Sequence, residues 1–212
     1  MTFRVALTFD AEHPDRPATD GNAEGLLDVL AAEGLRATIF IRGRWAEYPA
    51  TARRIAEAGH LVGSHSFYHA RMPLLTDAGI EADIRDAEEA IRAFAGVDPR
   101  PWFRCPFGAG ADDPRVIDRI ARLGYRDVHW NVTSEDWEPA RNAADIVRIV
   151  VAGARLQGDG AVVLQHTWPD QTLGAIREII GGLRDLGATF VTVDALPPLP
   201  RPPVAEASPN PA

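Results

Sequence analysis

The sequence predicts an α/β domain with mostly parallel strands, because short apolar segments alternate with longer segments of helical periodicity from end to end. No internal repeat of fixed period is visible. The strand-like segments are residues 3–9, 37–41, 61–62, 102–104, 126–132, 161–165 and 189–193. The helix-like segments are residues 21–33, 49–58, 76–94, 113–123, 143–156 and 173–186.

Local signals mark where these elements begin and end. The first strand runs into a loop rich in Asp and Pro, and the first helix carries leucines and a valine at helical spacing and stops at Gly34. Gly59 ends the second helix in the same way. The fourth helix has Asp113 as its candidate N-cap and Pro114 in its first turn. The sixth strand leads directly into His166.

Composition limits the kind of protein this can be. The chain has 212 residues, of which 46% are hydrophobic, enough for one domain with a sizeable core. The formal net charge of -8 argues against a nucleic-acid partner, and no apolar run is long enough to span a membrane. The single cysteine excludes an internal disulfide. No signal peptide precedes the first strand, so we expect a cytoplasmic location; the oligomeric state is left open.

The last part of the chain differs from the rest. Residues 197–212 are rich in proline and poor in core-forming side chains. We therefore expect residues 1–196 to form the domain and residues 197–212 to be a disordered, dispensable tail.

Polar residues with catalytic chemistry stand near the ends of the predicted strands. In parallel α/β folds such groups gather at the carboxyl ends of the strands, so we expect them on one rim. Four of them fall at or just past a strand end, and a fifth lies slightly farther on: Asp10, His65, Arg104 and His166, then Asp136.

The pair His65 and His69 suggests a metal site. Residues four apart lie on one face of a helical turn, so both imidazoles could reach one point. Neutral imidazole is the commonest protein ligand for zinc and similar cations. The pair alone is a weak signal, and the surrounding motifs strengthen it.

Five short motifs carry these residues: Thr-Phe-Asp-Ala-Glu at 8–12, His-Ser-Phe-Tyr-His at 65–69, Arg-Cys-Pro-Phe-Gly at 104–108, Thr-Ser-Glu-Asp-Trp at 133–137 and Val-Val-Leu-Gln-His at 162–166. In this order they resemble the motifs TFDDG, H-S/T-x-x-H, RxPxG, DxxDW and LxLxH of polysaccharide deacetylases with a NodB-homology domain. The resemblance covers about residues 3–193. The second and third motifs match in full, whereas Ala11 and Thr133 each replace an aspartate of the first and fourth motifs.

The resemblance implies a distorted, partly open (β/α) barrel of about seven parallel strands and a role for each site residue. Asp10 corresponds to the catalytic base, and Arg104 to the residue that pairs with it. His166 corresponds to the general acid, and Asp136 to the carboxylate that orients it. The other positions correspond to two metal ligands (His65 and His69), the stretch whose backbone N–H faces the oxyanion (Pro106 and Phe107) and the walls of the acetyl pocket (Trp137 and Leu164).

The implied reaction removes acetyl groups from N-acetylated amino sugars, so the expected partner is an N-acetylated glycan. The implied cofactor is a divalent metal ion, zinc first, with cobalt, nickel or manganese as alternatives. The chemistry fits these residue types. A metal activates water, an imidazolium can protonate the leaving amine, and a backbone N–H can stabilise the developing oxyanion.

Because Ala11 cannot bind a metal, a replacement carboxylate is expected nearby. We predict that Glu12 is this ligand, since in extended backbone it points to the same side as Asp10. Asp15 is the main competitor, although it lies beyond a proline, and His13 would point to the opposite side. A solvated Glu12 beside a weak two-histidine site is the alternative.

Two other functions remain open at this stage. The altered first motif is also compatible with hydrolysis of another linear or cyclic amide on the same fold. The two lost aspartates are compatible with a catalytically silent sugar-binding module, although the base, the acid and both histidines are retained.

Overall fold

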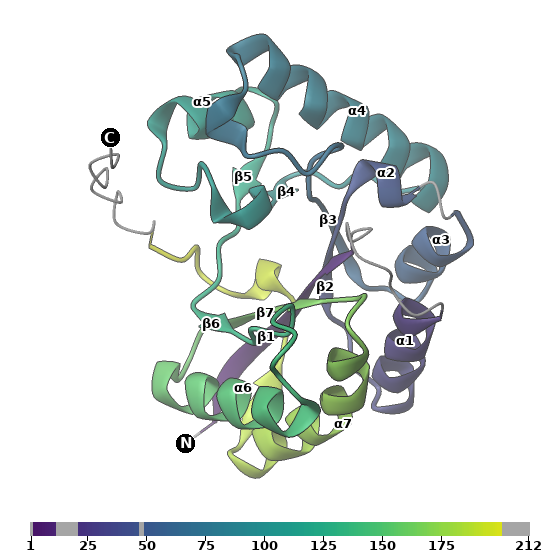
Figure 1. Cartoon of the computed structure of the whole chain (residues 1–212), viewed down its shortest axis with the longest axis vertical. Coiled ribbons are helices and arrows are strands. Elements are labelled where there is room, and N and C mark those ends of the chain that lie inside the picture. The colour runs from purple at the N-terminus through teal and green to yellow at the C-terminus, as the bar shows by residue number, and fades with distance from the viewer. Residues whose placement is uncertain (1, 12–20, 47–48, 201–212) are drawn as a thin grey trace.

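The computed structural model describes residues 2–11, 21–46 and 49–200 (Figure 1). Its strands all pair in parallel, in the order β5-β4-β3-β2-β1-β7-β6, and β8 pairs with the start of β1. The sheet curls into a half-barrel that is open between its end strands (Figure 1). This confirms the prediction of a partly open parallel barrel. The strands are β1 (Phe3–Ala11), β2 (Thr38–Ile41), β3 (Leu61–Ser64), β4 (Trp102–Phe103), β5 (Arg126–Asp127), β6 (Val132–Thr133), β7 (Ala161–His166) and β8 (Ala188–Phe190).

Helices cover the outside of the curled sheet (Figure 1). Asp113 caps α5 by accepting a hydrogen bond from the backbone N–H of Arg115 at 2.9 Å, and Pro114 is its first residue, as predicted. Gly96 ends α4 in the left-handed conformation, with φ at 76°. The helices are α1 (Asn22–Ala32), α2 (Gly43–Ala46), α3 (Pro49–Glu57), α4 (Asp77–Ala95), α5 (Pro114–Arg122), α6 (Ala143–Gln157) and α7 (Asp170–Asp185), with short 3-10 turns η1 (Met72–Leu74), η2 (Pro106–Gly108) and η3 (Val193–Ala195).

One predicted strand is wrong. Residues 126–132 do not form a single strand, because β5 pairs with β4 at one edge of the sheet and β6 pairs with β7 at the other. Between them the chain crosses the open side of the half-barrel. The apolar residues of this segment pack in two different places: Val128 and Trp130 lie against the apolar cluster inside the half-barrel, and Val132 belongs to the main core cluster.

The two faces of the sheet bury different side chains. Val5, Leu7 and Phe9 of β1 belong to the main core cluster, which includes residues of α1, α6 and α7. Ala6, Thr8 and Asp10 alternate with them and therefore face the inside of the half-barrel. An apolar cluster fills this interior below the rim: Ala6, Phe40, Trp102, Val162, Val193 and Leu196. The inward-facing residues of β1 therefore become polar toward the end of the strand, where Asp10 lies at the rim.

The packed chain continues past Leu196. Leu199 is partly buried against the interior cluster, and residues 197–200 line a cavity of about 330 Å³ together with Trp102 and Val162. The first four residues of the predicted tail thus contact the domain, and residues 201–212 lie outside the described part of the chain. That the tail is dispensable stays a prediction for residues 201–212 only.

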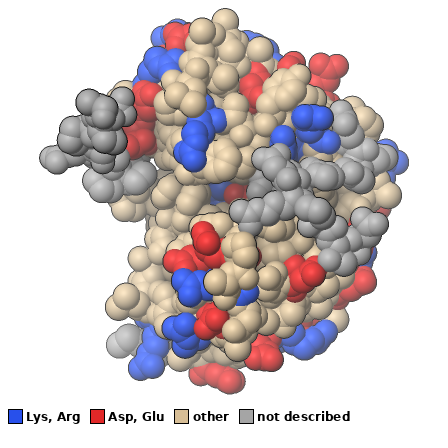
Figure 2. Space-filling model, viewed as in Figure 1, with Lys and Arg blue, Asp and Glu red and all other residues tan. Residues whose placement is uncertain are grey.

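Two surface properties bear on partners. Acidic and basic side chains are interspersed on the face in Figure 2, without a large area of one sign. Among the described residues, no helix combines the length and apolarity needed to cross a membrane.

Candidate active site

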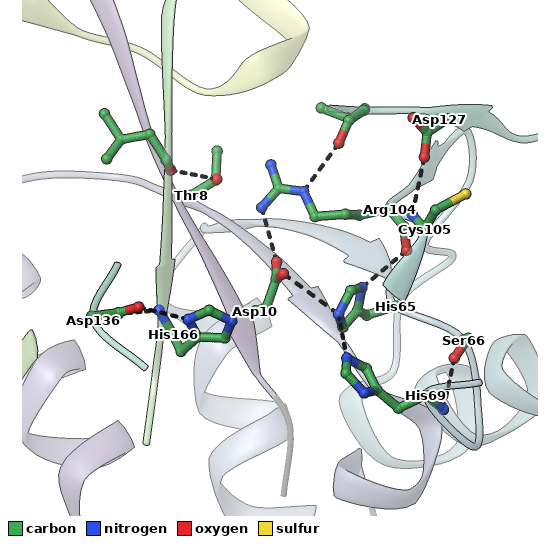
Figure 3. A network of polar contacts seen from close by, with 12 residues as sticks. Thr8, Asp10, His65, Ser66, His69, Arg104, Cys105, Asp127, Asp136 and His166 are labelled. Carbon is green, nitrogen blue, oxygen red and sulfur yellow. Dashed lines mark hydrogen bonds and ion pairs between the residues drawn. The ribbon is translucent and has the colours of Figure 1, made fainter. Parts of the chain in front are cut away.

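Strands that end at one rim bring the predicted site residues together (Figure 3). Asp10 of β1 is in register with His166 of β7. The ends of β3 and β4 are also in register, so the residues that follow them, His65 and Arg104, are neighbours. Asp10 lies between His166 on one side and the histidine pair on the other (Figure 3).

Arg104 and Asp10 form a buried ion pair. Nη1 of Arg104, which is fully buried, lies 2.8 Å from Oδ1 of Asp10. The Nε–H of Arg104 donates to the Val128 carbonyl at 3.0 Å, and Cζ of Arg104 lies 4.1 Å from the centre of the Phe40 ring. These contacts hold the guanidinium against Asp10, so the predicted pairing is present.

The two histidines point at each other, and His65 also points at Asp10. Nε2 of His65 is 3.1 Å from Nε2 of His69 and 3.4 Å from Oδ2 of Asp10. Nδ1 of His65 lies 2.9 Å from the Arg104 carbonyl oxygen. Because a carbonyl only accepts, Nδ1 carries the hydrogen and Nε2 presents its lone pair to the site.

The histidines do not converge by the predicted helical turn. Residues 65–69, which we call the histidine loop, have irregular backbone, with φ of 63° at Ser66 and 60° at His69. Both values lie in the left-handed region that residues other than glycine rarely adopt. Contacts from outside the loop must therefore determine its shape.

His166 is held by Asp136. Oδ1 of Asp136 is 2.7 Å from Nδ1 of His166, and Oδ2 accepts from the His166 backbone N–H at 2.7 Å. The hydroxyl of Thr172 also donates to Oδ2, at 2.6 Å. Because a carboxylate accepts, Nδ1 of His166 carries a hydrogen, and Nε2 is the ring nitrogen that does not face Asp136. No sequence signal had pointed to Thr172.

Aromatic and apolar groups surround the polar residues. The Trp137 ring is 5.4 Å from the His166 ring, in an edge-on arrangement. Leu164 is buried on the same face of β7 as His166, because the two are two residues apart on the strand. Phe107 is 56% exposed, and its ring lies 4.4 Å from that of His69. Its neighbour Pro106 is buried and has no N–H, so only Phe107 can offer the expected backbone donor. The sequence analysis missed one further wall, the Trp168 ring at 6.0 Å from His166.

The described residues fit a divalent cation in part. Two imidazole nitrogens 3.1 Å apart can both contact one ion at the usual metal–nitrogen distance of about 2.0–2.1 Å. No group of three or more His, Cys, Asp or Glu side chains arranged for a metal occurs within the described ranges. Glu12, the predicted third ligand, lies outside the described residues, as do its competitors His13 and Asp15. Ala11 is buried in the main core cluster.

Two buried groups near the sheet have structural roles. Burial raises the pKa of the Cys105 thiol well above its ordinary value, which disfavours the nucleophilic thiolate. Burial also lowers the pKa of His60, whose Nδ1 accepts a hydrogen bond from the Ala37 backbone N–H at 3.1 Å. Neither group takes part in the site.

The sequence profile of the family described as polysaccharide deacetylase matches residues 2–128. The chain belongs to the polysaccharide deacetylase family. It is 34% identical to a chitooligosaccharide deacetylase of Rhizobium leguminosarum bv. trifolii, over 91% of this chain and 85% of that protein. A family 4 carbohydrate esterase from Streptomyces lividans, solved in complex with acetate, has a TM-score of 0.77 at 33% identity, over 89% of this chain and 91% of that one. Membership of this family suggests a divalent metal cofactor.

Other polysaccharide deacetylases are longer. A peptidoglycan-N-acetylglucosamine deacetylase of Listeria monocytogenes is 33% identical over 91% of this chain, which spans 38% of the length of that relative. The similarity therefore concerns one domain of that longer protein, the part that aligns with the site residues described above.

Proposed function

We propose that this chain is a metal-dependent hydrolase that removes acetyl groups from N-acetylated amino sugars. The observation that carries the proposal is the position of Asp10, paired with Arg104, between the histidine pair and the His166–Asp136 pair. This arrangement offers a cation site, a base and an acid around one point. The relatives support the substrate class, since they are named for peptidoglycan and chitooligosaccharide.

Each residue has a role in this proposal. His65 and His69 would hold a divalent cation, which when bound acts as a Lewis acid toward the acetamide carbonyl and activates water. Asp10 takes the proton from the attacking water, and Arg104 keeps its carboxylate in place. His166 donates a proton from Nε2 to the departing nitrogen.

The remaining residues orient the substrate and its charge. The Asp136 carboxylate holds His166 through Nδ1, so that Nε2 faces the scissile bond. The N–H of Phe107 donates to the developing oxyanion. Trp137 and Leu164 enclose the acetyl methyl group, which favours small acyl groups.

We propose zinc as the cation, with cobalt, nickel or manganese as alternatives. Metal content is measured by elemental analysis of the purified protein. Hydrolysis is measured with chitooligosaccharides and, in parallel, with cyclic imides and ureides. Zinc with release of acetate from the sugars supports the proposal, whereas turnover of the cyclic amides alone contradicts it.

The roles are separated by variants. A chelator should abolish hydrolysis and added metal should restore it. His65→Ala should lose the metal, whereas His166→Ala should keep it and lose turnover, because His166 is assigned as an acid. Metal loss in His166→Ala would overturn that role. A protein that binds metal and sugar without turnover would be a silent binding module.

A further inference from the structure

The histidine loop is held from one side by a buried acid of α4. Oδ2 of Asp83 accepts from the Phe67 backbone N–H at 3.0 Å, and Oδ1 accepts from that of Tyr68 at 2.9 Å. Asp83 is only 4% exposed, and its carboxylate also accepts from the hydroxyl of Ser66. Both oxygens are therefore engaged by three consecutive residues of the loop.

A chain of hydrogen bonds links Asp83 to the second histidine. The Ser66 hydroxyl, which donates to Asp83, accepts from the backbone N–H of His69 at 2.9 Å. This bond spans the loop between its two left-handed residues, Ser66 and His69. A residue other than glycine is strained in this conformation, and the surrounding contacts must offset that strain.

The other side of the loop is held by the end of β2 and the start of α2. Nη2 of Arg42 donates to the Tyr68 carbonyl at 3.0 Å, and the Gly43 N–H donates to the Ser66 carbonyl at 2.8 Å. A Cβ at Gly43 would stand 2.4 Å from the Phe67 ring and 2.9 Å from Cα of Ala87. At Gly43, α2 therefore packs closely against both Phe67 of the loop and Ala87 of α4.

We propose that Asp83 is a positioning residue for the metal ligands, because its carboxylate fixes the backbone between His65 and His69. The inference rests on the proposed function, in which these histidines bind the cation. A buried carboxylate is costly unless its hydrogen bonds are made, and here it makes them to the loop backbone. Burial raises the pKa of Asp83, and the three hydrogen bonds oppose that rise.

The test measures metal affinity directly. Wild type, Asp83→Asn and Asp83→Ala are titrated with Zn²⁺ in competition with a chromophoric chelator. Partners that orient metal ligands typically contribute 10- to 100-fold in affinity, so we expect about a 10-fold loss for Asp83→Asn and more for Asp83→Ala. The matched control is Asp86→Asn, an exposed acid of the same helix, which should bind as wild type does.

A second readout separates positioning from general stability. The visible absorption of the Co²⁺-loaded protein reports ligand geometry, and it should change in Asp83→Asn but not in Asp86→Asn. If Asp83→Asn fails to fold, Ser66→Ala removes the hydroxyl that links Asp83 to His69 but leaves the two backbone hydrogen bonds of Asp83, and it should still weaken Zn²⁺ binding.

The outcomes are distinguishable. A folded Asp83→Asn with wild-type Zn²⁺ affinity and an unchanged Co²⁺ spectrum overturns the inference and leaves the proposed function intact, and so does wild-type affinity in Ser66→Ala where Asp83→Asn does not fold. Wild-type protein that binds Zn²⁺ no better than His65→Ala refutes the proposed function itself.

Discussion

Replacing Arg104 with methionine tests the buried ion pair at the centre of the site. Methionine keeps much of the apolar stem but removes the hydrogen bonds to Asp10 and to the Val128 carbonyl. Asp10 would then be a buried carboxylate without its guanidinium partner. Arg104→Met should therefore destabilise the fold and also remove turnover.

The size of the effect follows from burial. The Arg104 and Asp10 side chains are 0% and 5% exposed. Removing one partner of a buried ion pair costs about 3–5 kcal/mol. For a chain of this size, each kcal/mol lowers the melting temperature by about 2–4 °C, so we expect a drop of about 6–20 °C.

The assay is urea and thermal unfolding in the presence of a chelator, so that metal affinity does not contribute. Arg104→Met, Asp10→Ala and the double variant form a cycle in which the double variant should lose less than the sum of the two. The control is Arg100→Met, whose ion pair with Asp98 is 40% and 41% exposed and should contribute less than about 1 kcal/mol. Additivity within about 0.5 kcal/mol, or an effect no larger than that of the control, would refute the reasoning.

Three further predictions concern the third ligand, pH and the tail. Glu12→Ala should lose bound metal by elemental analysis, whereas Asp15→Ala should keep it; full occupancy in Glu12→Ala contradicts the assignment. Because burial lowers the pKa of His60, the unfolded chain takes up the proton first, and stability should fall as pH drops from about 7 to about 5. In His60→Gln, the free energy of unfolding measured with urea should fall less over this pH range than in wild type, and an equal fall would exclude this histidine as the cause. Truncation after Pro200 should leave the melting temperature unchanged, whereas truncation after Leu196 also removes a partly buried leucine and should cost about 1 kcal/mol; equal stability of the two would show that this contact contributes nothing.

Hydrophobic periodicity located the helices well, because each buries one face against the sheet. The expected helix 76–94 is observed as Asp77–Ala95, with Thr76 as its cap, and 143–156 as Ala143–Gln157. The segment 126–132 misled the same reasoning. Its two ends pair at opposite edges of the sheet, and a local apolar pattern does not record which edge a strand joins.

The sequence by itself determined most of the order of strands and helices along the chain and the residues at the strand ends, because periodicity and short motifs are local properties. Only the tertiary structure decided how the histidines converge. The conformation of their loop is fixed by hydrogen bonds to Asp83 and Arg42, and Asp136 is held by Thr172, 36 residues later. Such bonds depend on sheet order and register, which bring distant residues together, and no spacing within the chain encodes them.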